Sequence, residues 1–370
     1  MNYVMLVMAV FAVIGALDRI LGNRLGLGKE FERGLSMFGS LALSMIGMIV
    51  LAPVIADLLR PALTAMAKVL PIDPSIVPAS LFAIDMGGAP LCEELATSSD
   101  VGLFHGLVVA SMMGCTVSFT VPFALGTVKK EQHHALLVGL LCGIVTVPVG
   151  CLVAGLFTSI PLGVLLLNLC PLALFSALIA LGLWKAPNAC VKIFSVVGLL
   201  LKILITAGLA VGIVSFLTGY EILPGAESFA NAAEIVLNAT VVLTGAFPLI
   251  KILSWILKRP LGALGRKIGV NDSSMMGFLS SLAASMTTFD QMQYMDPKGT
   301  VLNAAFAVSA AFALTDHLAY TLAWRADYLP IVLVGKLVAG VLAVLVACLV
   351  YRRLYGHDLE EQNNIREKNK

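Results

Sequence analysis

The sequence contains little charge for its length, and this scarcity excludes most classes of soluble protein. Lys, Arg, Asp and Glu together make up 12% of the 370 residues, whereas soluble domains carry about 25%. Apolar residues make up 59% of the chain, and the mean hydropathy is +0.96. The segment 135–157 has no charged residue and is long enough to cross a bilayer. The composition therefore predicts an all-α polytopic membrane protein that lies in the lipid bilayer.

Several motifs of catalysis and metal binding are also absent. The chain has no G-x-x-x-x-G-K-[ST] loop for ATP hydrolysis, no H-E-x-x-H for a zinc protease and no G-x-S-x-G for a serine hydrolase. Its seven cysteines lack the paired spacing of a metal site. The net charge of +2 comes from scattered residues and does not indicate nucleic-acid binding. We therefore expect no enzymatic activity, no cofactor and no bound metal.

The chain does contain a series of apolar segments separated by short polar loops. They predict nine membrane spans, at about 2–21, 36–58, 101–125, 135–157, 161–183, 194–217, 234–257, 300–324 and 331–351. Two further stretches, 75–96 and 273–295, are apolar but interrupted by polar residues. We divide the chain into a first repeat over 1–157, a connecting span over 158–189, a second repeat over 190–352 and a charged cytoplasmic tail over 353–370.

The division into repeats rests on residue matches at an offset of 199. The matches are Arg60-Pro61 with Arg259-Pro260, Lys68 with Lys267, Asp73 with Asp272, Ser75 with Ser274, and Thr116 with Thr315. In both repeats the matched residues lie in the same order of elements: a span, an amphipathic piece, an interrupted stretch and a polar span. The alternative is chance matching in an apolar sequence of low diversity.

The distribution of Lys and Arg tests whether the interrupted stretches cross the membrane, because these residues collect on the cytoplasmic side. If both stretches are re-entrant, most basic loops fall inside and the two repeats are inverted. If both stretches cross, the bias weakens. The rule favours re-entrance, which is typical of secondary transporters with a site where two interrupted helices meet. Lys202, Lys251 and Lys336 lie near predicted span ends, and we expect them to snorkel to the interface.

The first interrupted stretch carries the strongest candidate for a cation site. Asp85 lies in an apolar run, and Gly87 and Gly88 interrupt the helix and free carbonyl groups as further acceptors. An acid at such a break suits a cation at mid-membrane. The alternative is a capping acid that holds the loop. Glu93 and Glu94 follow on the return arm, where they either face a cavity or are solvated at the surface.

The second stretch and the eighth span supply further candidates. Thr287 and Thr288 can bond a broken backbone or a substrate hydroxyl, and Asp290 is another acid in an apolar setting. Asp316-His317 lies in the middle third of a span, where ionisable residues are costly unless they face a cavity. We expect cation binding at Asp316 and proton relay through His317, with an interhelical hydrogen-bond clamp as the alternative. Two membrane aspartates could also form an intramembrane aspartyl hydrolase.

Several segments resemble the ethanolamine-utilisation permease family. They are Asp18-Arg-Ile20, Asp85-Met-Gly-Gly88, Glu94-Leu-Ala96, Ser111-Met-Met-Gly114, the run from Gly143 to Cys151, the run from Ala304 to Leu314 with Asp316-His-Leu318, and Val334-Gly-Lys336. They occur in order from the first span to the last. The resemblance implies an inner-membrane transporter that takes up ethanolamine for its breakdown in the bacterial cell. Asp85 and Asp316 lie in the similar segments, so a role in holding the substrate ammonium carries over to them.

The second stretch departs from the family pattern, in which we expect an Asn pair and a Pro before the aromatic residue. This chain has Ala284-Ser285, Thr287 and Asp290 there, and Glu93 replaces an expected basic residue. Another small amine or amino alcohol therefore stays open as substrate, and a transporter of a carboxylate or nucleoside is the more distant alternative. The sequence leaves open whether transport is driven by membrane potential, by protons or by facilitated diffusion, and it is compatible with a homo-oligomer.

Overall fold

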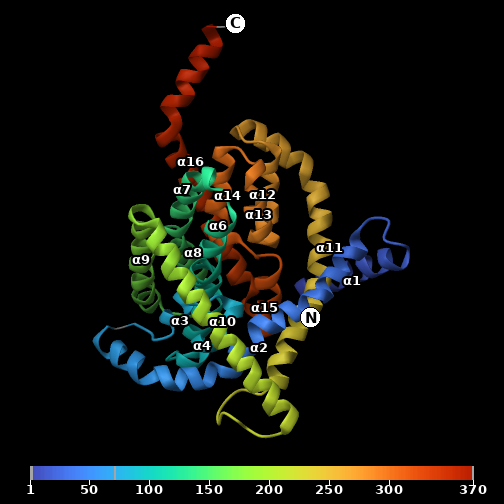
Figure 1. The fold of residues 1–370 in the computed structure, drawn as a ribbon, viewed down its shortest axis with the longest axis vertical. Coiled ribbons are helices and arrows are strands. Elements are labelled where there is room, and N and C mark those ends of the chain that lie inside the picture. Colours follow the sequence, from blue (N-terminus) through green and yellow to red (C-terminus); the bar gives the residue numbers. More distant parts are fainter. Residues whose placement is uncertain (1–2, 71, 369–370) are drawn as a thin grey trace.

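The computed structural model of the chain describes residues 3–70 and 72–368 (Figure 1). All regular elements in this part of the chain are helices, and eight helices are long and apolar enough to cross a membrane. This confirms the prediction of an all-α polytopic membrane protein. The α-helices are α1 (Tyr3–Ile20), α2 (Leu27–Val69), α3 (Ile76–Leu81), α4 (Gly88–Leu95), α5 (Ser99–Leu103), α6 (Val121–Thr127), α7 (His133–Ile144), α8 (Val147–Gly155), α9 (Leu162–Lys185), α10 (Pro187–Thr218), α11 (Phe229–Ile268), α12 (Asp272–Ala283), α13 (Ser285–Gln291), α14 (Pro297–Ala310), α15 (Asp316–Arg325) and α16 (Leu329–Lys368).

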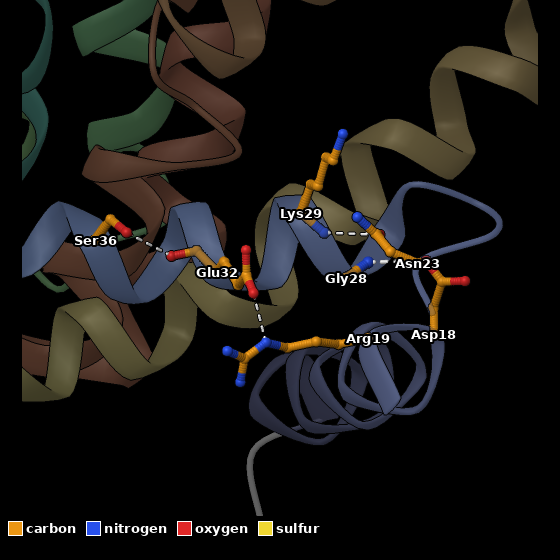
Figure 2. Close-up of polar contacts among 7 residues, drawn as sticks. All are labelled: Asp18, Arg19, Asn23, Gly28, Lys29, Glu32 and Ser36. Atoms are coloured by element: carbon orange, nitrogen blue, oxygen red, sulfur yellow. Dashed lines mark hydrogen bonds and ion pairs between the residues drawn. The ribbon is translucent and has the colours of Figure 1, made fainter. Parts of the chain in front are cut away.

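The turn between α1 and α2 is held by Asp18, whose neighbourhood is drawn in Figure 2. Its carboxylate accepts hydrogen bonds from the backbone N–H groups of Leu25 and Gly28, both at 2.9 Å. The first N–H groups of a helix lack partners within the helix, so an acceptor there fixes where α2 begins. The Nε atom of Arg19 on α1 lies 2.5 Å from Glu32 on α2 and joins the two helices beyond the turn.

The first interrupted stretch folds back on itself as a hairpin of α3 and α4. The carboxylate of Asp73, just before α3, accepts hydrogen bonds from the backbone N–H and the hydroxyl of Thr97, just after α4, at 2.9 and 2.5 Å. It also accepts from the N–H and hydroxyl of Ser75, at 2.9 and 2.5 Å. The two ends of the stretch therefore lie side by side, which is the geometry that a re-entrant segment requires.

The second interrupted stretch is closed in the same way. The N–H of Asn271, before α12, donates to the Asp296 carboxylate at 2.7 Å, and the Asn271 side chain donates to the Tyr294 carbonyl at 2.9 Å. The hydroxyl of Ser274 lies 2.7 Å from Asn271 Oδ1 and 3.1 Å from Asp296 Oδ2. Ser274 thus has the place of Ser75, as the offset suggests. The role of Asp73, however, belongs to Asn271 and Asp296 rather than to the aligned Asp272.

The two hairpins lie in opposite halves of the molecule. Figure 1 shows α3 and α4 in the lower half and α12 and α13 in the upper half. The C-terminal part of α2 runs across the bottom and that of α11 curves over the top, and both helices contain two prolines. The breaks of the two hairpins meet in one buried cluster, in which Ala83 and Ala284 pack with Ala311 and Phe312. The inverted relation of the two repeats stays a prediction that this arrangement supports.

The prediction of an unbroken eighth span over 300–324 is wrong. α14 ends at Ala310, and α15 begins at Asp316. Between them the backbone N–H groups of Phe312 and Leu314 donate to the carbonyls of Ser281 and Leu282, at 3.0 and 2.9 Å. The second hairpin therefore supplies the hydrogen-bond partners that the broken helix loses. Phe312 has φ +60°, a conformation that residues other than glycine rarely adopt.

The span 99–127 connects the first hairpin with α14. Its middle is wound as π-helix over Phe104–Gly114 and Thr116–Thr120. The hydroxyl of Thr116 donates to the Val308 carbonyl at 3.1 Å, and Ser118 Oγ accepts from the Ala83 N–H at 3.2 Å. This span therefore holds the tip of the first hairpin against the second half of the chain.

Glycines allow a close helix contact between α2 and α10. A Cβ atom on Gly47 would lie 1.8 Å from the Ile205 carbonyl oxygen, and one on Gly208 would lie 2.2 Å from the Gly47 carbonyl oxygen. Small residues at a crossing let two backbones approach, which is the usual basis of helix association in membranes. α2 also packs along α11, so it lies between the two halves.

Candidate functional site

A cavity of about 250 Å³ lies where the first hairpin, α2 and the break before α15 meet. Five elements contribute to its wall, so its shape depends on the whole fold rather than on one segment. The lining residues are Met37, Ser40, Leu41, Ser44, Ala83, Asp85, Met86, Cys115, Phe119, Met286, Phe312, Asp316 and His317. Most of the wall is apolar, and the polar groups are few, which is typical of small-molecule sites.

Asp85 reaches this cavity because the chain leaves the helical path beside it. It lies in a single 3-10 turn, Ile84–Met86, between α3 and α4. Gly87 follows with φ +102°, and a Cβ atom there would lie 2.4 Å from the Met48 side chain, so no other residue fits without strain. The N–H of Gly88 then donates to the Ala83 carbonyl at 2.9 Å and closes the turn. The two glycines position Asp85 by shaping the backbone.

Asp316 reaches the same cavity from the second half of the chain. It is the first residue of α15, and the break before it exposes the helix N-terminus. An anionic side chain is favoured there because the first N–H groups of a helix carry a partial positive charge. The hydroxyl of the preceding Thr315 donates to the Ala283 carbonyl and holds the break against α12. Asp85 and Asp316, which the sequence analysis selected separately, therefore line one cavity.

His317 lies beside Asp316 and is 2% exposed. Its Nδ1 atom lies 3.0 Å from the Nζ atom of Lys336, which also donates to the Ser111 carbonyl at 2.8 Å. Lys336 is 1% exposed, so the prediction that it snorkels to the interface is wrong. α16 carries this lysine inward, against the π-helical segment and α15.

Glu93 and Glu94 do not line the cavity. Both are exposed on the last turn of α4. Glu93 accepts a hydrogen bond from the indole N–H of Trp324 at 2.5 Å, and this contact links α4 to the end of α15. A role for these two acids in substrate binding stays a prediction.

The candidates on α13 are also set apart from the cavity lining. Thr287 and Asp290 are exposed, whereas Thr288 is buried. The hydroxyl of Thr288 donates to the Gly277 carbonyl at 3.1 Å and lies 2.9 Å from the Ser281 hydroxyl, so it joins α13 to α12. Their binding roles stay predictions, and the structure gives Thr288 a packing contact.

Three polar residues of this region were not predicted from the sequence to lie at the site. Ser40 and Ser44 lie one turn apart on α2 and line the cavity, and Lys336 lies behind His317. The spacing of the two serines could have indicated one shared face of a helix. Lys336 was predicted to snorkel to the interface, and its charge within an apolar run was the signal that could have placed it at the site.

Comparison with known proteins identifies the relatives of this chain. The family model described as "Ethanolamine utilisation protein, EutH" matches residues 1–350. The chain is 42% identical to the probable ethanolamine permease EutH of Listeria monocytogenes, over 94% of this chain and 93% of that protein. It is 36% identical to the probable ethanolamine permease EutH of Salmonella typhimurium, over 94% of each chain. An uncharacterised Bacillus subtilis protein, YxeR, is 37% identical over 93% of each chain. No solved structure matches the chain.

Proposed function

The chain belongs to the EutH family of ethanolamine utilisation proteins, and we propose that it carries ethanolamine across the membrane with the ammonium group held by Asp85 and Asp316. The family is one of permeases rather than enzymes, so the intramembrane hydrolase is not retained as an alternative. The helices and the family together give a multi-pass protein of the bacterial inner membrane.

The cavity carries this proposal through its chemistry. Ethanolamine is a small cation at neutral pH with one hydroxyl group. Two carboxylates from opposite halves of the chain face a cavity with an otherwise largely apolar wall. An ion pair gains strength where water is scarce, and a bound cation would offset the cost of placing two acids inside the membrane. Anionic substrates such as carboxylates would instead require basic groups at the cavity wall.

The departures from the family pattern bear on the choice of amine. Glu93, Thr287 and Asp290 depart from the pattern, yet none of them lines the cavity. The residues that do line it include Asp85 and Asp316, which lie in the family-like segments. This placement supports ethanolamine as the substrate, because none of the departing residues is among those that line the cavity.

Transport requires access to the cavity from each side in turn. We propose that the hairpin of α3 and α4 and the hairpin of α12 and α13 alternately open it, as one repeat moves against the other. The buried cluster that joins their tips is the contact that such a movement would rearrange. The membrane potential can drive a cation inward, with about 2.3 kcal/mol per charge per 100 mV.

Uptake of labelled ethanolamine into proteoliposomes tests this function. The purified protein is reconstituted and assayed at two pH values, with and without a negative-inside potential. Saturable uptake that rises with potential alone indicates an electrogenic uniporter. Uptake that follows a pH gradient indicates proton coupling, for which His317 is the candidate. No saturable uptake by folded protein would refute the proposal and direct the search to other small amines.

A further inference from the structure

The buried pair of Lys336 and His317 has no role in the ammonium site described above. A buried lysine in a membrane protein is energetically costly, so such a residue usually has a function. The Nζ atom of Lys336 contacts the Ser111 carbonyl and His317 Nδ1. The carboxylate that acts on Lys336 is that of Asp85 from the first hairpin, and the thiols of Cys115 and Cys151 lie nearby on the π-helical span and α8. Asp316 precedes His317 on α15. The Asp85 carboxylate can balance a positive charge on Lys336.

The contact with Lys336 determines which nitrogen of His317 carries the ring proton. A lysine ammonium has three N–H donors and no acceptor, so the nitrogen that it contacts must accept. Nδ1 is that nitrogen, and the ring proton of a neutral imidazole is then on Nε2. With Nδ1 engaged by Lys336, Nε2 is the nitrogen left for the cavity that His317 lines.

The cavity has few groups that can donate a hydrogen bond to a substrate oxygen. Ionised Asp85 and Asp316 only accept. The hydroxyl of Ser44 donates to backbone carbonyls of α2, at 3.1 Å from Leu41 and 3.3 Å from Ser40. A thiol such as Cys115 is a weak donor. An N–H group on His317 and the Ser40 hydroxyl are the strong side-chain donors among the lining residues.

We propose that His317 Nε2–H donates a hydrogen bond to the hydroxyl oxygen of the substrate, and that Lys336 is the positioning residue that keeps this proton on Nε2. The inference rests on the proposed function and adds the group that distinguishes an amino alcohol from a simple amine. Asp85 and Asp316 bind the ammonium group of the substrate, and His317 donates a hydrogen bond to its hydroxyl group.

The surroundings of His317 hold the ring in place for this contact. The ring centroid lies 5.3 Å from that of Phe312, whose unusual backbone conformation places it in the break before α15. The backbone N–H of His317 donates to the Phe312 carbonyl at 3.2 Å, and the Thr321 hydroxyl donates to the backbone carbonyl of His317 at 2.6 Å. A preorganised donor loses little freedom when it binds a substrate, so it can contribute to selectivity.

Competition between ethanolamine and ethylamine, which lacks the hydroxyl, tests the inference. In proteoliposomes that take up labelled ethanolamine, we measure the concentration of each unlabelled amine that halves the rate of uptake. We expect the wild type to prefer ethanolamine by about ten-fold or more, since one hydrogen bond to a buried donor is lost with ethylamine. His317→Phe should bring the ratio close to one by weakening ethanolamine alone. His317→Gln, which can place an amide N–H near the Nε2 position, should restore part of the preference.

Lys336→Met should lower the same preference and raise KM more than it lowers kcat, because His317 is then free to move its proton to Nδ1. ¹⁵N NMR of labelled histidine should show His317 protonated on Nε2 in the wild type and mixed in Lys336→Met, with His317→Gln identifying the signal. Lys202→Met, at an exposed position on α10, is the matched control and should keep the wild-type ratio.

Three results would overturn the inference and leave the proposed function standing. They are equal half-inhibition of wild-type uptake by the two amines, a ratio unchanged in His317→Phe, and a ratio lost in Ser40→Ala but kept in His317→Phe. A folded wild-type protein that takes up no ethanolamine would refute the proposed function instead. The two failures are therefore distinguishable in one set of assays.

Discussion

Asp73 closes the first hairpin, and its substitution should loosen that hairpin more than any surface change. Four hydrogen bonds from Ser75 and Thr97 converge on its carboxylate. In Asp73→Asn an amide NH₂ faces one backbone N–H, whose hydrogen bond is lost, and the remaining hydrogen bonds lose their charged acceptor. A hydrogen bond to a charged group contributes about 1.5–3 kcal/mol and a neutral one about 0.5–1.5 kcal/mol, so the loss over the four bonds is about 3–6 kcal/mol. The free energy of opening the hairpin should fall by this amount.

Native-state hydrogen exchange measures that opening directly. A loss of about 3 kcal/mol corresponds to exchange about 100-fold faster, and the effect should appear in the amides of α4 and be weak in α9. Asp57→Asn, an exposed carboxylate on α2, is the matched control and should leave the α4 rates unchanged. Exchange in α4 that is equally fast in the wild type and in Asp73→Asn would refute the account of the hairpin base.

Three further predictions concern stability. Burial raises the pKa of Asp73, but the hydrogen bonds that its carboxylate accepts outweigh burial and lower the pKa. The contribution of Asp73 to folding stability is therefore present above its unfolded-state pKa and is lost as pH falls through its folded-state pKa. Hydrogen exchange in α4 should accelerate over that acid range in the wild type and not in Asp73→Asn. Gly47→Ala should cost about 1–3 kcal/mol in thermal unfolding because its Cβ would meet the Ile205 carbonyl, whereas Gly39→Ala has open space and should be neutral or stabilising. Asp18→Ala removes the acceptor of two backbone N–H groups and should give faster hydrogen exchange in the first turn of α2.

The sequence was sufficient to predict both interrupted stretches and the two acids that face the cavity. An acid in an apolar run is conspicuous, because burial in lipid has no compensation. Glycine beside Asp85 also indicated a break in the helix. These signals are local in sequence, and they hold in the folded protein because the bilayer imposes the same free-energy cost for unpaired polar groups on every segment.

The break before Asp316 could not be predicted in the same way. The segment 311–315 contains neither glycine nor proline, and its backbone groups find partners only when α12 lies beside it. The orientation of Lys336 was missed for a related reason. A position near a span end suggests snorkelling, but packing against the π-helical segment carries Lys336 inward. Both features depend on contacts between segments that are distant in sequence.

We propose that Asp85 and Asp316 together hold the substrate ammonium. Isothermal titration of ethanolamine into the purified wild type, Asp85→Asn, Asp316→Asn and the double variant measures the contribution of each carboxylate. We predict that each single variant weakens binding by about 10- to 100-fold, as expected for loss of one charge from a partly shielded ion pair. We also predict that the double variant loses less than the product of the two effects, because both acids contact one cation. Wild-type affinity in the folded double variant would contradict the claim.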